Sequence, residues 1–206
     1  MLLVETADCC GGGAAGDSVA TLKVLLGAGC QEKALVPVVD PLAAALCHRA
    51  GVGSQLSFPL GHRVDPRWGT PAEVSGDVIR LTDGKFRYSG GIWDGQFGDM
   101  GPTAVFRIGP IDVMIASHAT YDWNDEQFQS VDLNTHQAKF VVVKNPMNYQ
   151  MAYGSIARKA YILDTPGPTP ATLKHVQFQR LQRPYFPADA EIPDLIPKVY
   201  ASAKFL

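Results

Sequence analysis

Strand-like and helix-like segments alternate along the first sixty residues of this chain. Residues 1–8 and 34–39 are apolar runs of strand length, while 18–26 and 42–50 carry apolar side chains at helical spacing. A further strand is expected at 54–60. This β-α-β-α-β order predicts an α/β fold, in which helices cover the faces of a sheet.

The middle of the chain has a different pattern. Strand-like runs at 73–81, 86–88, 103–108 and 111–117 follow one another without a helical segment between them. Asp83-Gly84 separates the first two runs and is a hairpin signal. We therefore expect a single domain with a mixed β-sheet, helices on its faces and an antiparallel β-meander in the middle.

Local signals predict where several elements begin. Asp40 followed by Pro41 is a strong helix start, because the aspartate caps the helix and proline fits its first position. Asp17 is expected to cap the preceding helix. Pro37 lies inside the strand at 34–39 and favours an edge position or a bulge, because proline cannot donate a ladder hydrogen bond.

Alternation returns in the last third of the chain. A short helix is expected at 124–131, followed by a strongly apolar strand at 139–144. A second helix at 148–159 then leads into a strand at 160–164. No repeat and no internal linker interrupts this order, which favours one mixed domain.

Composition excludes several classes of protein. The 206 residues include 18 Lys plus Arg against 20 Asp plus Glu, so no basic excess points to nucleic acid. No apolar run has the length of a membrane span, and no secretory leader is recognisable. Four cysteines, two of them adjacent, do not form a disulfide framework and favour a reducing compartment. We expect a cytoplasmic protein with no nucleic-acid or membrane partner.

A glycine-rich turn follows the first strand. Gly11, Gly13 and Gly16 fit the dinucleotide pattern G-x-G-x-x-G, and Asp40 stands where such folds place a ribose-binding acid. Asp8, Cys9 and Cys10 separate the strand from the first glycine, however, and the helix starts too late for the second glycine to meet a pyrophosphate. Asp40 is also explained as a helix cap.

The same turn nearly matches a phosphate-binding P-loop, but Asp17 stands where that motif needs lysine. Two interpretations of the turn remain open. Its free N–H groups, near a helix N-terminus, would favour a carboxylate or a substrate carbonyl. Alternatively, the glycines serve a tight connection that needs positive φ angles.

The sequence shows little sign of a nucleophile or a metal site. Cys9 and Cys10 are more simply two small buried residues at a strand end than catalytic thiols. The histidines stand singly along the chain, without the spacing of a metal site: His48, His62, His118, His136 and His175.

Two polar clusters follow apolar strands. One follows the strand at 111–117 and contains Ser117, His118, Tyr121, Asp122 and Asp125; the other contains Lys144, Asn145, Asn148 and Tyr149. Ligands of open α/β sheets bind at such strand ends. We therefore expect Asp8, the Gly11–Gly16 turn, His118 and Lys144 to face one groove, with the segment from Lys144 to Tyr149 as the better functional candidate.

The order of these motifs resembles the C-terminal domain of MlrC-type metallopeptidases, the microcystin-degradation group. The resemblance spans residues 1–189, which we take as the domain, with 190–206 as a C-terminal tail. It rests on LLVETADCCGGGAAGDS, GVGSQLSFPLGH, IRLTDGKF, GPTAV, FVVVKNPMNYQMAY, DTPGPT and RLQRPYFPAD. The family's Asn-Pro after the first aspartate is Cys9-Cys10 here, and its frequent histidine after the lysine strand is Asn148.

The resemblance implies a two-domain zinc hydrolase that cleaves amide bonds in small peptides, with its zinc in an N-terminal domain. No metal ligand transfers to this chain, so no cofactor is expected in it. The partners implied are that N-terminal domain, in cis or in trans, and a small peptide substrate. The expected substrate-contact or domain-contact residues are Asp8, Gly11, Gly12, Gly13, Asp17, His118, Lys144, Asn148 and Arg183.

The first strand starts without a leader, so we expect a preceding domain that this chain lacks. The leading hypothesis is a domain that supports substrate binding or closes over a metal-bearing partner. Two alternatives remain: a nucleotide-dependent α/β enzyme that uses the Gly11–Gly16 turn, and a non-catalytic interaction domain.

Overall fold

The computed structural model of this chain describes residues 1–173, 176–189, 191–192 and 199–200. The chain divides into two units, Met1–Ala171 and Thr172–Leu206. The expected domain boundary at 189–190 falls inside the second unit. Of the expected tail at 190–206, only 191–192 and 199–200 lie within the described residues.

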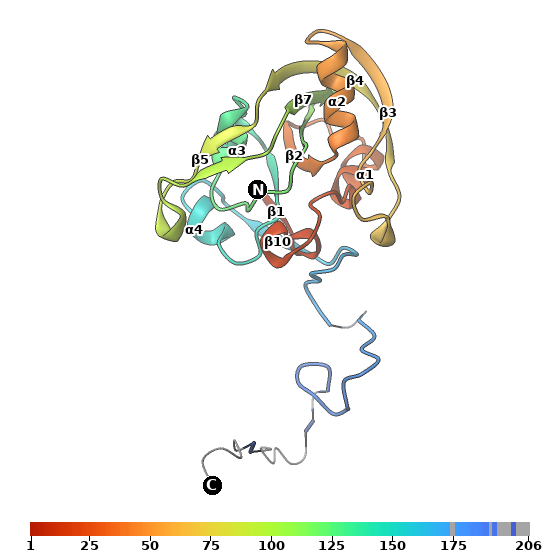
Figure 1. The fold of residues 1–206 in the computed structure, drawn as a ribbon, viewed down its shortest axis with the longest axis vertical. Coiled ribbons are helices and arrows are strands. Elements are labelled where there is room, and N and C mark those ends of the chain that lie inside the picture. Colours follow the sequence, from red (N-terminus) through yellow and green to blue (C-terminus); the bar gives the residue numbers. More distant parts are fainter. Residues whose placement is uncertain (174–175, 190, 193–198, 201–206) are drawn as a thin grey trace. The chain divides into compact units, whose positions relative to one another are not determined.

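An eight-stranded mixed sheet forms the centre of the first unit, in the order β10-β1-β9-β2-β8-β7-β4-β3 (Figure 1). The first five strands in that order run parallel to one another: β10 (Ala160–Leu163), β1 (Leu2–Glu5), β9 (Phe140–Val143), β2 (Ala34–Val39) and β8 (Ile111–Ala116). The remaining strands are antiparallel: β7 (Thr103–Ile108), β4 (Ala72–Thr82) and β3 (Gln55–Leu60). The predicted α/β class, mixed sheet and antiparallel section are confirmed.

Two apolar cores cover the two faces of this sheet. On one face, α1 (Ala20–Gly27) and α2 (Pro41–Ala50) pack on strand residues such as Val36 and Val38. Leu35 and Val39, which alternate with them, belong to the core on the other face. That face is covered by α3 (Glu126–Ser130), α4 (Tyr149–Tyr153) and the small two-stranded sheet of β5 (Lys85–Arg87) and β6 (Phe97–Asp99). The structure therefore has three layers.

Pro37 lies in an interior strand, so the predicted edge position is wrong. β2 runs between β8 and β9, but its ladder with β9 ends after Leu35. The amide of Val39, two residues on and on the same side of the strand as Pro37, donates to Gly16 O instead of a strand. Proline is tolerated because its missing N–H faces the side on which β9 no longer pairs.

The Asp83-Gly84 hairpin prediction is also wrong. β4 pairs with β3 and β7, whereas β5 pairs with β6 in the separate small sheet. Gly84 has φ +73°, and a side chain there would collide with Gly101 O. The turn therefore directs the chain out of the large sheet, and the hairpin joins β3 to β4 through residues 61–71.

The helices are short. The predicted cap at Asp40 is confirmed, because its carboxylate accepts a hydrogen bond from Ala43 N at 2.9 Å. Short 3-10 helices lie in the connecting loops: η1 (Thr6–Asp8), η2 (Cys10–Gly12), η3 (Pro66–Trp68), η4 (Gly91–Trp93) and η5 (Thr135–Gln137). In the described part of the chain, no helix combines the length and the hydropathy needed to span a bilayer.

Candidate functional site

The glycine turn follows β1 at the edge where the parallel strands end. Gly11, Gly12 and Gly13 are exposed, and Gly13 and Gly16 have φ of +91° and +76°. A Cβ atom on Gly16 would lie 2.7 Å from Cys10 Sγ, and one on Gly12 would lie 2.7 Å from Thr169 Cγ2. A side chain on Gly11 would meet the ring of Tyr121. Glycine is therefore required by positive φ angles and close packing.

The N–H groups of the turn are mostly used within it. Gly12 and Ala14 donate to Cys9 O, and Gly13 donates to Cys10 O. Gly16 N donates to Asp8 Oδ1 at 2.8 Å. In addition, α1 begins only at Ala20, so the turn does not abut a helix N-terminus. These amides are therefore not free donors for an anion, which was one of the two interpretations of the turn, and this argues against the nucleotide alternative.

Asp8 and Lys144 form a buried ion pair beneath the turn. Lys144 Nζ donates to Asp8 Oδ2 at 2.7 Å, to Gly16 O at 2.8 Å and to Ser18 O at 3.0 Å. Asp8 also accepts from the amides of Gly16 and Ser18. All three ammonium donors are occupied, so Lys144 fixes the path of the turn. The expectation that Asp8 and Lys144 share one end of the sheet is confirmed.

The surroundings of Lys144 keep it charged. Burial would lower the pKa of this lysine, but the carboxylates of Asp8 and Glu5 outweigh burial and raise the pKa above its ordinary value. The ammonium group of Lys144 is therefore the counter-ion of the Asp8 carboxylate beneath the turn.

Asp17 does not cap α1, so that prediction is wrong. The N-cap of α1 is Val19, and no side chain caps it. Asp17 Oδ2 instead accepts from the amides of Val64 and Asp65, both at 2.8 Å. The Asp17 carboxylate thereby connects the β3–β4 loop to the segment that follows the glycine turn. Local sequence signals do not encode such a long-range contact.

His118 and Asp122 line a narrow crevice beside the turn. The crevice, about 30 Å³ in volume, is also lined by Cys10, Gly16 and Lys144. Of the residues expected to face one groove, Gly16 of the turn, His118 and Lys144 line this crevice, whereas Asp8 and Gly11 to Gly13 do not. His118 itself is exposed, and its backbone N donates to Met100 O at 2.8 Å.

Asp122 lines this crevice although it was not among the expected contact residues. It is 8 % exposed, and one carboxylate oxygen accepts from Lys144 N at 3.0 Å. Burial, aided by Glu126, outweighs that hydrogen bond and raises the pKa of Asp122 to about 7. A carboxyl group that exchanges its proton near neutral pH can donate or accept a hydrogen bond from a ligand. In the sequence, Asp122 could be recognised only as a member of the polar cluster that follows β8.

Asn148 joins the glycine turn through an aromatic side chain. Its Nδ2 donates to Tyr121 Oη at 3.0 Å, and the ring of Tyr121 packs on Gly11. Arg183 belongs to the second unit, where its Nε donates to Asp189 Oδ2 at 2.6 Å. Whether the expected residues contact substrate or another domain stays a prediction.

The thiols of the turn are poor nucleophiles. Burial raises the pKa of Cys9, and it raises the pKa of Cys10 to about 12, so both stay protonated at neutral pH. Among the residues that the structure describes, no three His, Cys, Asp or Glu side chains group as metal ligands.

Residues 3–180 of the chain match the family described as MlrC C-terminus. The chain belongs to this family. A curated relative, "Microcystinase C" of Sphingomonas sp., is 22 % identical over 187 residues, which are 91 % of this chain and 35 % of that protein. A crystal structure described as "Putative metallopeptidase" from Mesorhizobium sp. BNC1 has a TM-score of 0.79 and 25 % identity.

The chain is much shorter than these MlrC relatives. It covers 35 % of the Sphingomonas protein, while the structural match includes 97 % of this chain and 39 % of the Mesorhizobium protein. The predicted family is confirmed.

Proposed function

We propose that this MlrC C-terminal domain works beside a zinc-bearing N-terminal domain in an amide hydrolase. In that arrangement the glycine-turn edge, formed by the loops at 9–16, 145–154 and 165–171, would close over the metal. This edge would also help to hold a small peptide-like substrate. The observation that carries the proposal is the family match over residues 3–180 to proteins with more than half of their length outside the matched part.

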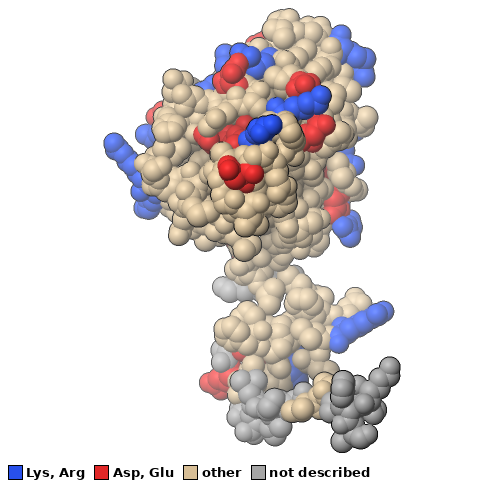
Figure 2. Space-filling model, turned by 60° about the vertical axis from the view of Figure 1, so that its left-hand side comes forward, with Lys and Arg blue, Asp and Glu red and all other residues tan. Residues whose placement is uncertain are grey.

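The loops at the glycine-turn edge have the amino-acid composition of a protein–protein interface. Segments 9–16, 145–154 and 165–171 contain no Lys, Arg, Asp or Glu. Met147 and Met151, in and beside α4, are 82 % and 70 % exposed. In Figure 2, charged side chains gather over the upper part of the first unit, and the lower part, where α4 and the turn lie in Figure 1, is largely uncharged. Interface cores are depleted of charge and enriched in methionine.

The glycine turn suits a surface on which a substrate or partner backbone approaches closely. Gly11, Gly12 and Gly13 are exposed, and a Cβ atom placed on Gly13 would meet nothing within 4 Å. The buried Asp8–Lys144 pair holds the main chain at the end of the turn, at Gly16 and Ser18. Such a turn needs little reordering when another chain binds, which lowers the entropic cost of association.

Zinc chemistry would come from the partner. The described residues offer no cluster of metal ligands. A zinc ion bound in the N-terminal domain would polarise the amide carbonyl and lower the pKa of its bound water. The part assigned to this chain is binding and enclosure: the turn supports the substrate backbone, and the uncharged edge excludes water.

Reconstitution tests the proposal. The full chain is mixed with the separately produced N-terminal part of the Sphingomonas relative, and cleavage of a small peptide is followed with and without a chelator. We expect no cleavage by this chain alone, well below one zinc per chain by elemental analysis, and chelator-sensitive cleavage only in the mixture. Stoichiometric zinc in the isolated chain, or cleavage by it, would overturn the proposal, and binding without cleavage would favour the non-catalytic interaction domain.

A further inference from the structure

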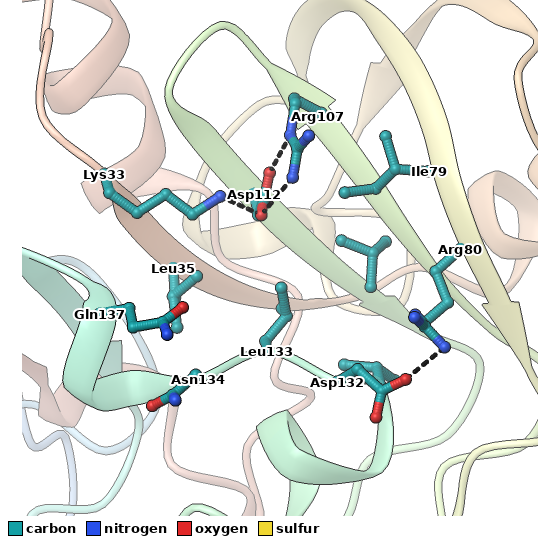
Figure 3. Close-up of a pocket in the computed structure, with 12 residues that line it drawn as sticks. Lys33, Leu35, Ile79, Arg80, Arg107, Asp112, Asp132, Leu133, Asn134 and Gln137 are labelled. Carbon is teal, nitrogen blue, oxygen red and sulfur yellow. Dashed lines mark hydrogen bonds and ion pairs between the residues drawn. The ribbon is translucent and has the colours of Figure 1, made fainter.

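A second cleft lies at the other end of the parallel strands. Lys33 immediately precedes β2, and Asp112 is the second residue of β8, so both stand where these strands begin. The glycine turn, in contrast, follows the end of β1. Arg107 of β7 and the loop at 131–137 complete the cleft, whose volume is about 340 Å³ (Figure 3). That volume is within the range of small-molecule sites.

A buried carboxylate holds two cations at one end of the cleft. Asp112 is 1 % exposed and accepts from Arg107 Nε at 2.8 Å and Nη2 at 3.1 Å. Lys33 Nζ forms an ion pair with the same carboxylate. Burial alone would raise the pKa of Asp112, but the hydrogen bonds from Arg107 and Lys33 outweigh it and lower that pKa. Asp112 is therefore a fixed anion that orients both cations.

The two cations keep unused donors and an unbalanced charge. One buried carboxylate lies between the two cations, and Asp77, which stands opposite Arg107 in the β4–β7 pair, offsets part of the remaining positive charge. Arg107 uses two of its five N–H groups on Asp112, and Lys33 uses one of three; in the described structure the others have no partner. Their side chains are 45 % and 36 % exposed, so these donors are reachable from solvent.

The lining of the cleft also includes two buried leucine side chains, and an ion pair lies at its far end. Leu35 and Leu133 are buried and line its floor. Arg80 and Asp132 form an ion pair on the opposite side, and Figure 3 shows this pair away from the Lys33 end. Gln137 lies on the same side as Lys33 in that view, and its side-chain amide has no partner among the described residues.

We propose that this cleft binds a small organic monocarboxylate. Its carboxylate would accept hydrogen bonds from Lys33 and Arg107, and its apolar body would cover Leu35 and Leu133. The guanidinium edge of Arg107 left free by Asp112 matches the planar geometry of a carboxylate. A fully hydrated inorganic anion would gain nothing from the apolar floor, and a neutral amide would leave the positive charge unpaired.

One nearby acid opposes this binding and supplies a sensitive test. Asp77 lies opposite Arg107 in the β4–β7 register but does not line the cleft. Its negative charge offsets part of the positive charge of Lys33 and Arg107. Replacing it, in Asp77→Asn, should therefore tighten the binding of a carboxylate.

The test is a titration of the full ¹⁵N-labelled chain with sodium butyrate, followed by amide chemical shifts at constant ionic strength. Butyramide serves as the neutral isostere and inorganic phosphate as the anion without an apolar body. We expect saturable shifts from butyrate at 33–35, 107 and 131–137, with much weaker responses to the other two. No saturation by butyrate, equal shifts by butyramide, or phosphate binding as tightly as butyrate would overturn the proposal.

Variants locate the site. Lys33→Met leaves the Arg107–Asp112 pair intact and should weaken butyrate binding about tenfold, the usual effect of losing a charge-assisted hydrogen bond. The matched control is Lys85→Met, an exposed lysine of the small sheet that pairs with Asp83. It should leave the affinity unchanged. Equal effects of the two variants would show nonspecific charge attraction and contradict the proposal.

Discussion

Lys144 Nζ lies 2.7 Å from Asp8 Oδ2, and this contact joins residues that stand 136 positions apart in the sequence. Both side chains are about 95 % buried, and the lysine also binds two carbonyl groups of the following loop. The end of β9 thereby fixes the loop that follows β1. The Asp8–Lys144 pair is the structural basis of the glycine-turn edge.

Lys144→Met should destabilise the fold by about 3–5 kcal/mol, because it leaves Asp8 buried without its counter-ion. Chemical denaturation measures the change in the free energy of unfolding. The double variant Asp8→Asn, Lys144→Met should recover part of the loss, while Lys85→Met should change stability by less than about 1 kcal/mol. A Lys144→Met protein as stable as the parent would show that the pair does not hold the turn.

Gly16→Ala and Gly27→Ala should have opposite effects. Gly16 has φ +76° and no room for a Cβ, so the alanine should cost about 2 kcal/mol. Gly27 ends α1 with open space around it, and alanine there should stabilise the protein by up to about 1 kcal/mol. Thermal unfolding of both variants compares them directly. A neutral Gly16→Ala would contradict the packing argument.

The pKa of Asp122, raised to about 7, predicts a pH-dependent stability. Between about pH 4 and pH 7 the folded state keeps a proton that the unfolded chain has released, so this carboxyl's contribution to stability falls as pH rises. The loss is on the order of 4 kcal/mol. The free energies of unfolding of the parent and of Asp122→Asn should therefore converge at low pH. Near pH 7 they should differ, with the variant more stable.

The control for this pH effect is Asp83→Asn, which changes an exposed carboxylate that pairs with Lys85. The difference in free energy of unfolding between Asp83→Asn and the parent should hardly vary over the same pH range. A constant difference between the parent and Asp122→Asn would mean that Asp122 ionises at its ordinary pKa.

Alkylation should spare the cysteines of the turn. Burial raises the pKa of Cys9, Cys10 and Cys47, so little thiolate forms at neutral pH. Cys30 is partly exposed and should react first with iodoacetamide. Peptide mapping after limited reaction identifies the modified residue, and Cys30→Ser should slow overall labelling. Rapid labelling at Cys10 would instead revive the thiol-nucleophile hypothesis.

The sequence predicted what local patterns can encode. Strands such as β7 and the Asp40 cap of α2 are confirmed, because apolar runs and capping residues act within a few positions. Predictions were wrong where the local structure depends on a contact between residues far apart in the sequence. Asp17 binds a loop almost fifty residues away instead of its own helix, and Pro37 is accommodated because β9 diverges from β2.

The same difference between local patterns and distant contacts applies to the candidate site. Polar residues at strand ends predicted that the turn, His118 and Lys144 meet, because parallel strands end at one edge. The sequence could not show that Lys144 uses all its donors on the protein, or that Asp122 is a buried residue lining the crevice. The first depends on the loop between β1 and α1, and the second on the position of Lys144 and of the first turn of α3.

The central claim is that the uncharged glycine-turn edge receives a zinc-bearing domain. Its most direct test is calorimetric binding of the N-terminal part of the Sphingomonas relative to the parent chain, to Met147→Asp, Met151→Asp and to Leu42→Asp. Leu42 is an equally apolar, 62 % exposed residue on α2 and serves as the control. We predict that the double variant loses binding about a hundredfold or more while Leu42→Asp binds like the parent. Unchanged binding of the double variant, or an equal loss in Leu42→Asp, would contradict the claim.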